Sequence, residues 1–168
     1  MNKQNLKVGV EVQVAGARSK PAVVVGVYPH RNDKLSFPVS LKLVDGKLVE
    51  RNGLYLGAQV TTGFMRIKRE VAEHFAARSP TYGWPQPDGS IKTVFAVFDR
   101  GVQGGEFVGE DMQFSRRCEA DGIEVWVDPT VNFSHRGTKA WEGCFKPSLD
   151  HLLLQQPGLV VPAPGVAA

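Results

Sequence analysis

Hydrophobic positions along the chain follow strand patterns in three segments. Residues 22–27 read AVVVGV, a continuous apolar run of mostly β-branched side chains, which is typical of a strand buried on both faces of an α/β sheet. Residues 91–98 form another apolar run, and residues 123–127 alternate between apolar and polar side chains. We predict a strand in each segment, with residues 22–27 at the centre of the sheet.

Shorter patterns predict a hairpin and further strands. Asp45-Gly46 is a two-residue hairpin signal, and it separates residues 39–43 from residues 47–50, so these two segments are expected to pair. Weaker strand patterns cover residues 8–14, 64–67 and 131–133.

Two segments repeat apolar side chains at helical spacing. Residues 68–77 and residues 110–120 both have this period. In the second segment Phe114 and Cys118 lie four positions apart, and Gly122 is the expected stop at its C-terminal end. We predict a helix in each.

The remaining segments organise the chain as one domain. Residues 79–90 hold three prolines and two glycines, so we expect a loop there. Residues 147–168 begin with a short helical stretch and end in PGLVVPAPGVAA, which has no pattern that would pack on a core. We expect one α/β domain over residues 1–146, with a mixed sheet and flanking helices, and a largely disordered tail over residues 147–168.

Composition argues against several classes of protein. The 168 residues are 42% hydrophobic and 22% charged, which suits a globular core, and the net charge of +3 includes no Lys/Arg block of the kind that binds nucleic acid. Cys118 and Cys144 have no CxxC spacing, so we expect no zinc site. No signal-peptide pattern and no apolar run long enough to cross a bilayer is present, which predicts a cytoplasmic protein without a membrane span.

The first candidate site is the acidic start of the second helix. Glu110 and Asp111 follow the glycine-rich residues 101–109, which we interpret as a mobile lid over a site. Carboxylates at a helix start are stabilised by the helix dipole, so the pair either caps the helix or serves catalysis. Arg116 and Arg117 follow on the same helix and are either ligands for an anion or solvated surface side chains.

Two further segments carry candidate residues. His135 follows a short strand, so its ring is expected to be accessible at a sheet edge, as either a surface histidine or a ligand. Thr62 and Gly63 precede another strand, where a glycine either lets a ligand approach the backbone or marks a bulge.

Three segments in this order, VVVGVYPHR, TTGFMRIKREV and FVGEDMQFSRRCEADGIEVWVDPTVNFSHRGT, resemble a bacterial and phage family of glycosyltransferases with the GT-A fold. The resemblance runs over about residues 20–145, and the long segment around Glu110-Asp111 is its most specific part. It implies a partial GT-A-like fold and an enzyme that transfers a sugar from a nucleotide-sugar donor to a glycan or another hydroxyl acceptor.

The resemblance also implies roles for single residues. Asp111 would be the catalytic base, with Glu110 beside it. Thr62 and Gly63 would line the acceptor site, and His135 would be a metal ligand. Such enzymes use a divalent cation to absorb the charge of the departing nucleoside diphosphate, and Mg²⁺ and Mn²⁺ prefer oxygen ligands, with one histidine tolerable for Mn²⁺.

The chain departs from the family at its N-terminal side. Family members begin with a nucleotide-binding region that ends in an Asp-x-Asp motif, whereas residues 1–20 contain no aspartate. We expect the chain to be a truncated domain that needs a missing half or a partner, and the alternative is a non-catalytic module that binds a glycan or a protein. In either case we expect an exposed sheet edge or apolar patch beside residues 22–27, which favours a partner chain or self-association.

Overall fold

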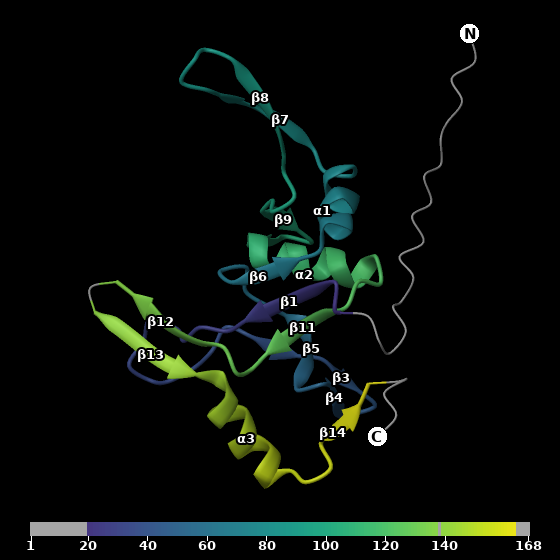
Figure 1. The fold of residues 1–168 in the computed structure, drawn as a ribbon, viewed down its shortest axis with the longest axis vertical. Coiled ribbons are helices and arrows are strands. Elements are labelled where there is room, and N and C mark those ends of the chain that lie inside the picture. Colours follow the sequence, from purple (N-terminus) through teal and green to yellow (C-terminus); the bar gives the residue numbers. More distant parts are fainter. Residues whose placement is uncertain (1–19, 138, 164–168) are drawn as a thin grey trace, which may run out of the picture.

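A mixed sheet forms the centre of the molecule (Figure 1). The structure is a computed structural model, and it describes residues 20–137 and 139–163. The strands of the sheet run in the order β14-β4-β5-β11-β1-β6, with β2 paired to β5 and β3 paired to β4. These strands are β1 (Val23–Gly26), β2 (Ser40–Leu41), β3 (Leu43–Val44), β4 (Lys47–Arg51), β5 (Leu54–Gln59), β6 (Met65–Ile67), β11 (Val125–Asp128) and β14 (Val160–Pro162).

Strand β1 lies inside the sheet, as its apolar run predicts. It pairs in parallel with β11 and antiparallel with β6. Strand β14 is parallel to β4, whereas β5 is antiparallel to both β4 and β11. Together with the helices, this mixed sheet confirms the α/β class. The strand pattern at residues 8–14 lies outside the described residues.

Helices α1 (Arg69–Ala76) and α2 (Glu110–Ala120) cover one face of the sheet, and α3 (Phe145–Gln155) packs further along it through Leu149 (Figure 1). The two predicted helices at residues 68–77 and 110–120 are therefore confirmed. Beneath α1 and α2 lies the main core, in which side chains of β1 and β11 contact both helices. Its buried members are Val23, Val25, Val27, Val60, Val71, Phe75, Phe114, Cys118, Ile123, Val125 and Val127.

The C-terminal end of α2 has the stop that the sequence predicts. Gly122 adopts a φ of +67°, a left-handed conformation that glycine reaches without steric cost. The N–H of Gly122 donates to the carbonyl of Glu119, and the N–H of Ile123 donates to the carbonyl of Cys118 at 2.8 Å. This pair of bonds is a Schellman motif, and it directs the chain from α2 into β11.

The hairpin signal at Asp45-Gly46 is also confirmed, but the expected pairing of residues 39–43 with residues 47–50 is only partly right, because Leu43–Val44 pair with β4 whereas Ser40–Leu41 pair with β5. Asp45 and Gly46 both have positive φ, 51° and 74°, which is the geometry of a type I′ turn. The turn joins β3 to β4 in register, with Val44 opposite Lys47.

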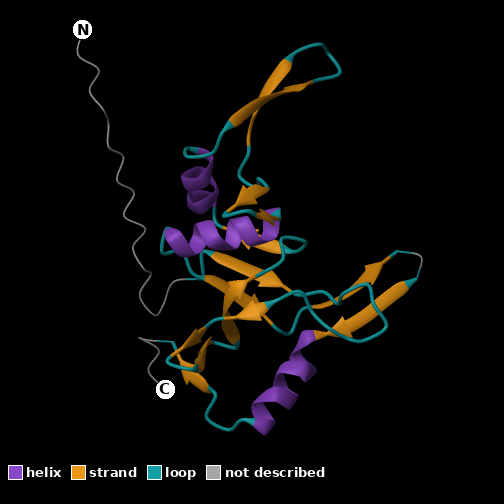
Figure 2. Ribbon diagram, turned by 180° about the vertical axis from the view of Figure 1, so that it is seen from behind, coloured by secondary structure: helices purple, strands orange, loops and turns teal. Residues whose placement is uncertain are grey.

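Three two-stranded hairpins project from the sheet. They consist of β7 (Thr81–Pro85) with β8 (Ile91–Phe95), β9 (Gly101–Gln103) with β10 (Glu106–Val108), and β12 (Asn132–Arg136) with β13 (Ala140–Cys144). Figure 2 shows that β7 and β8 extend away from the rest of the described molecule. Residues 101–109, which we interpreted as a lid, consist mostly of the hairpin of β9 and β10.

Two segments differ from the sequence predictions. The expected loop at residues 79–90 contains β7, and the apolar run at residues 91–98 contributes β8 to a separate hairpin rather than a strand to the central sheet. The physical reason is local pairing: β7 and β8 are joined by a short turn in which Gly89 has a φ of +82°, so each finds its neighbour in the other.

The expected tail at residues 147–168 is ordered over its described part. Helix α3 continues to Gln155, and Val160–Pro162 form β14 beside β4. The short apolar run has a place to pack because Val161 and Ala163 join a core cluster with Trp126 on the second face of the sheet. Residues 164–168 lie outside the described residues.

Candidate functional site

Asp111 is the second residue of α2, and its carboxylate binds a distant loop. The Oδ1 atom accepts a hydrogen bond of 2.9 Å from the backbone N–H of Thr62, 49 positions away, and a second one from the Thr62 hydroxyl. Among the described residues Oδ2 has no hydrogen-bond partner. The carboxylate therefore joins α2 to the segment before β6, and simple capping of its own helix does not account for it.

A cavity of about 310 Å³ lies beside Asp111. Its wall includes Thr61, which is only 4% exposed and whose hydroxyl has no hydrogen-bond partner among the described residues. An unpaired buried hydroxyl costs free energy of about 1–3 kcal/mol, so it would gain from a polar ligand or a water. The other lining residues are Phe37, Pro38, Val39, Ser40, Gln59, Val60 and Met112.

Gly63 makes room for a side chain rather than for a ligand. A Cβ atom at this position would lie 2.5 Å from Cε1 of Tyr28, so any side chain larger than hydrogen would push the tyrosine ring away. The ring of Tyr28 in turn packs edge-on against His135, with centroids 5.0 Å apart. The space next to Gly63 that sequence analysis assigned to substrate is filled by Tyr28.

His135 is half-buried on β12 and has a defined tautomer. Its Nδ1 lies 3.0 Å from the carbonyl oxygen of Pro29. Because a carbonyl only accepts, Nδ1 carries the hydrogen, and a neutral imidazole then keeps its lone pair on Nε2. Metal-binding histidines commonly have this arrangement. Among the described residues, however, no group of three or more His, Cys, Asp and Glu lies together as a cation site would need.

The other predicted residues lie outside this arrangement. Arg117 donates to the carbonyl of Val97 at 2.8 Å and to the Ser79 hydroxyl at 3.0 Å, so its guanidinium holds the end of α1 and does not line the cavity beside Asp111. Arg116 is exposed, and it lies 3.3 Å from the side-chain oxygen of Gln103 on β9. Glu110 is exposed at the first position of α2.

Four of the predicted residues thus belong to one series of contacts, in which Tyr28 connects the Thr62–Gly63 segment to His135. Asp111 holds Thr62, the adjacent Gly63 packs on Tyr28, and Tyr28 packs on His135. Tyr28 lies just beyond the C-terminal end of β1, which is parallel to β11. In open α/β sheets, ligands bind outside this end of parallel strands.

Sequence analysis did not select Tyr28 or Thr61 as site residues. The Tyr-Pro pair that ends the apolar run was a usable signal for Tyr28, because it marks the end of a central strand. No local signal distinguishes Thr61, whose buried and unpaired hydroxyl arises from contacts with α2 and the neighbouring strands.

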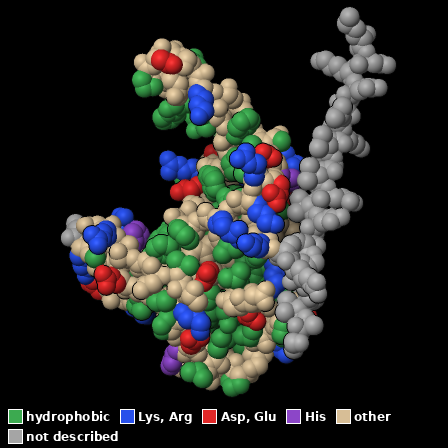
Figure 3. Space-filling view, in the orientation of Figure 1, with side chains coloured by type: hydrophobic (Ala, Val, Ile, Leu, Met, Phe, Trp, Pro, Cys, Tyr) green, Lys and Arg blue, Asp and Glu red, His purple; other side chains and the backbone are tan. Residues whose placement is uncertain are grey.

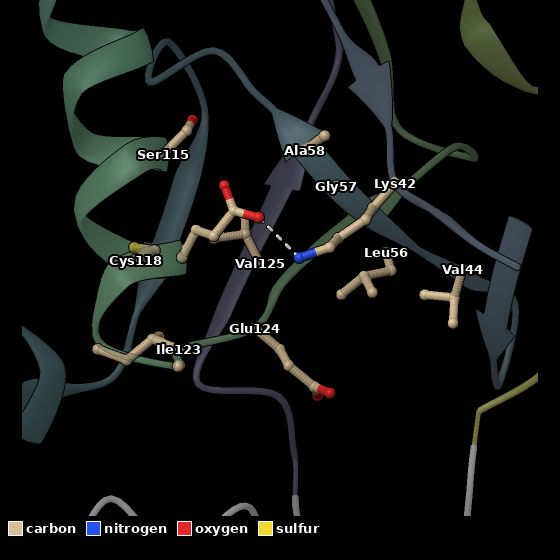
Figure 4. A pocket seen from close by; sticks show the side chains of 12 residues that line it. Lys42, Val44, Leu56, Gly57, Ala58, Ser115, Cys118, Ile123, Glu124 and Val125 are labelled. Atoms are coloured by element: carbon tan, nitrogen blue, oxygen red, sulfur yellow. Dashed lines mark hydrogen bonds and ion pairs between the residues drawn. The ribbon is translucent and has the colours of Figure 1, made fainter.

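A second cavity of about 240 Å³ lies between α2 and β5 (Figure 4). The ammonium group of Lys42 crosses it to reach the carboxylate of Glu119 at 2.8 Å. Its wall includes Ser115, whose hydroxyl accepts from the N–H of Val60 and donates to the carbonyl of Asp111. This cavity contains none of the predicted site residues.

The buried His74 connects the C-terminal ends of α1 and α2. His74 is 8% exposed, and its Nδ1 accepts a 2.6 Å hydrogen bond from Arg78, since an arginine only donates. Nε2 therefore carries the hydrogen and donates to Asp121 at 2.6 Å. Both nitrogens are occupied, so His74 connects α1 to the end of α2 rather than offering a ligand atom.

The thiol of Cys118 is not a nucleophile. Burial in the core raises its pKa to about 12, so the thiol stays protonated at neutral pH. Cys118 and Cys144 are both free of disulfides.

No family model, no curated protein sequence and no solved structure matches this chain. None of the described helices is long and apolar enough to span a membrane.

Proposed function

We propose that this chain carries the acceptor side of a GT-A-like glycosyltransferase, with Asp111 as the general base. The observation that carries the proposal is the double hydrogen bond from Thr62 to Oδ1 of Asp111, because it orients the carboxylate beside the cavity while Oδ2 keeps its lone pairs free. A general base needs a fixed position within hydrogen-bond reach of the proton that it accepts.

The proposed reaction is a displacement at the anomeric carbon of a nucleotide-sugar. The acceptor hydroxyl lies in the cavity, and its proton passes to Oδ2 of Asp111. The hydroxyl oxygen forms a bond to the anomeric carbon, and the bond from that carbon to the phosphate oxygen breaks. Its electron pair leaves with the nucleoside diphosphate.

Thr62 and Gly63 have altered roles in this proposal. Thr62 positions the base, and Gly63 allows the close approach of Tyr28, which in turn supports His135. Glu110 remains an exposed carboxylate next to the base, and Arg116 is an exposed cation on the same helix, bonded only to the neutral side chain of Gln103 among the described residues, whose charge attracts an anionic donor.

A divalent cation, Mn²⁺ or Mg²⁺, does not fit the described residues by themselves. His135 offers one ligand atom, but the described part of the chain brings no second and third ligand to it. We therefore derive no step through a cation, and His135 stays a single candidate ligand.

A transfer assay tests the base. The purified chain is incubated with UDP-, GDP- and dTDP-sugars, Mn²⁺ and a panel of glycan acceptors, and products are detected by mass spectrometry. Where the wild-type chain gives detectable transfer, Asp111→Asn should lower kcat by roughly 10²–10⁴-fold, the usual contribution of a general base. Glu73→Gln, which changes an exposed carboxylate on α1, is the matched control and should keep the wild-type rate. A near-normal kcat for Asp111→Asn would remove Asp111 from this role.

Calorimetry with the same nucleotide-sugars tests the assignment of the acceptor side alone. Weak or undetectable binding is expected, because the proposal places only the acceptor cavity in the described residues. Micromolar binding would show that the chain also contains a complete donor site.

The second candidate function is binding of a glycan or a protein without catalysis. The observation that favours it is the exposure of Tyr82 and Trp84, 49% and 57%, on the projecting β7–β8 hairpin. Glycan-array binding that survives in Asp111→Asn, with no product from any donor, would support this alternative.

A further inference from the structure

The β7–β8 hairpin is an arm that stands outside the core. Nine of its ten strand residues are exposed, and Val94 is the exception. Figure 1 and Figure 2 both show the arm extending from the end of α1, with no other described helix or strand along its length. An isolated two-stranded hairpin is marginally stable in water, and three or more strands are usually needed. The arm therefore lacks the strand neighbours that would stabilise it.

Both faces of this arm carry exposed apolar side chains. One face carries Tyr82 and Trp84, and the other carries Ile91 and Phe95, which are 74% and 50% exposed. Figure 3 shows hydrophobic side chains along the arm. Apolar surface on both faces is more than a soluble monomer usually exposes in so small an element.

Among the described residues only β7 pairs with β8, so the outer edge of β8 is open for pairing with another strand. The bonds from Ala96 N–H to the Pro80 carbonyl and from Gln86 N–H to the Ser90 carbonyl set the alternation of the ladder. By this alternation, the N–H groups of Ile91, Thr93 and Phe95 point away from β7.

The outer edge of β7 is less suitable for pairing. Pro85 lies opposite Ile91, at a position whose N–H would point outward, and proline has no N–H to donate. Strand β8 contains no proline. Of the five residues of β8, only Lys92 is charged. Its side chain points from a face of the hairpin and does not block the edge.

We propose that two copies of this chain associate through the outer edges of β8, in antiparallel register about a two-fold axis at Thr93. The two arms then form one four-stranded sheet, β7-β8-β8-β7. This inference is independent of the proposed function, since it uses no residue of the cavity beside Asp111.

The sequence of β8 is self-complementary in this register. Thr93 faces its own symmetry mate, and threonine pairs are favourable across strands. Ile91 of one copy lies opposite Phe95 of the other, which forms an apolar pair on each side of the axis. Lys92 lies opposite Val94 of the other copy, so like charges do not meet.

The expected dimer is weak. The two paired edges are only five residues long, so we expect the buried area to fall below the roughly 1,200 Å² of stable complexes. We expect dissociation constants on the order of 10–100 μM, and therefore a monomer–dimer equilibrium that depends on concentration.

Charge reversal at the two-fold axis tests the register. In Thr93→Lys two ammonium groups face each other across the axis, and in Thr93→Glu two carboxylates do so, so that each variant alone should sediment as a monomer. An equimolar mixture of the two variants should recover dimer, because opposite charges then meet. Thr81→Lys is the matched control: it adds the same charge to the same face, but on β7, and should dimerise like wild type.

Sedimentation equilibrium of the full chain from about 5 to 500 μM decides the outcome. Circular dichroism confirms that each variant is folded, and the exposure of Thr93 makes this the expected result. Wild-type protein that stays monomeric over this range overturns the proposal and leaves the arm to a different molecule, such as a glycan. Dimerisation of Thr93→Lys at the wild-type affinity, or a mixture that fails to recover dimer, overturns it equally.

Discussion

The hydrogen bonds between Thr62 and Asp111 hold the carboxylate of the candidate site in place, and their contribution to stability can be measured. Replacement of Thr62 by valine keeps the β-branched shape and removes only the hydroxyl that donates to Oδ1. Replacement of Asp111 by alanine removes the acceptor for both the hydroxyl and the backbone N–H. The double variant completes a thermodynamic cycle.

The expected magnitudes follow from the burial of the pair. A hydrogen bond to a charged group contributes about 1.5–3 kcal/mol, and both bonds here are part-buried, so solvent screening lowers this value. We expect about 1–1.5 kcal/mol for Thr62→Val and about 2–3 kcal/mol for Asp111→Ala, because the latter leaves two donors unpaired. The coupling free energy should be about 1–1.5 kcal/mol.

Urea unfolding followed by circular dichroism measures these free energies, provided that the m-values of the four proteins agree. A parallel cycle of Thr62→Val with Glu110→Ala is the control, since Glu110 is adjacent to Asp111 but makes no hydrogen bond to Thr62. That coupling should stay within about 0.3 kcal/mol of zero. A Thr62–Asp111 coupling equally close to zero would refute the reasoning that this contact orients the carboxylate.

Two further predictions concern α2. Gly122→Ala should lower the free energy of unfolding, measured in urea, by about 1 kcal/mol: the added Cβ meets nothing within 4 Å, so the cost is that of placing alanine at a φ of +67°. Gly101→Ala is the control, because Gly101 is equally open but has no positive φ, and it should change the free energy of unfolding little. Equal losses in both variants would contradict the conformational explanation. The pKa of about 12 leaves Cys118 about 10³-fold less ionised than a thiol at the ordinary value of 9.0, so a thiol reagent at pH 8 should label half-buried Cys144 much faster, and labelling of Cys118 at a similar rate in the folded protein would show that the core opens.

Local sequence patterns determined the elements whose partners are close in the chain. The helix at Glu110–Ala120 and its stop at Gly122 depend on apolar spacing and on one left-handed residue, and both act within a few positions. The turn at Asp45-Gly46 and the strand at Val23–Gly26 can be predicted for the same reason, since each depends on residues within a few positions. The α/β class follows from these elements alone.

The sequence also selected the candidate residues, but it did not determine what each one contacts. Arg117 and Asp111 both looked available to a ligand, yet Arg117 donates to the carbonyl of Val97, and only Oδ2 of Asp111 is left without a partner among the described residues, because Oδ1 accepts from Thr62. The hydrogen bonds between Thr62 and Asp111, which are 49 positions apart, depend on how α2 packs against the segment before β6. No local sequence pattern predicts this packing. The same holds for Gly63, whose open side is filled by Tyr28.

Tertiary structure alone decided which strands join the central sheet. The apolar run at Ile91–Phe95 has the composition of a buried strand but pairs with the nearby Thr81–Pro85 and stays exposed. The short run at Val160–Pro162 has little pattern of its own but pairs with β4 and packs near Trp126. Strand propensity measures whether a segment fits a sheet. Whether that strand joins the central sheet and becomes buried depends on which strand edges the rest of the fold leaves available for pairing.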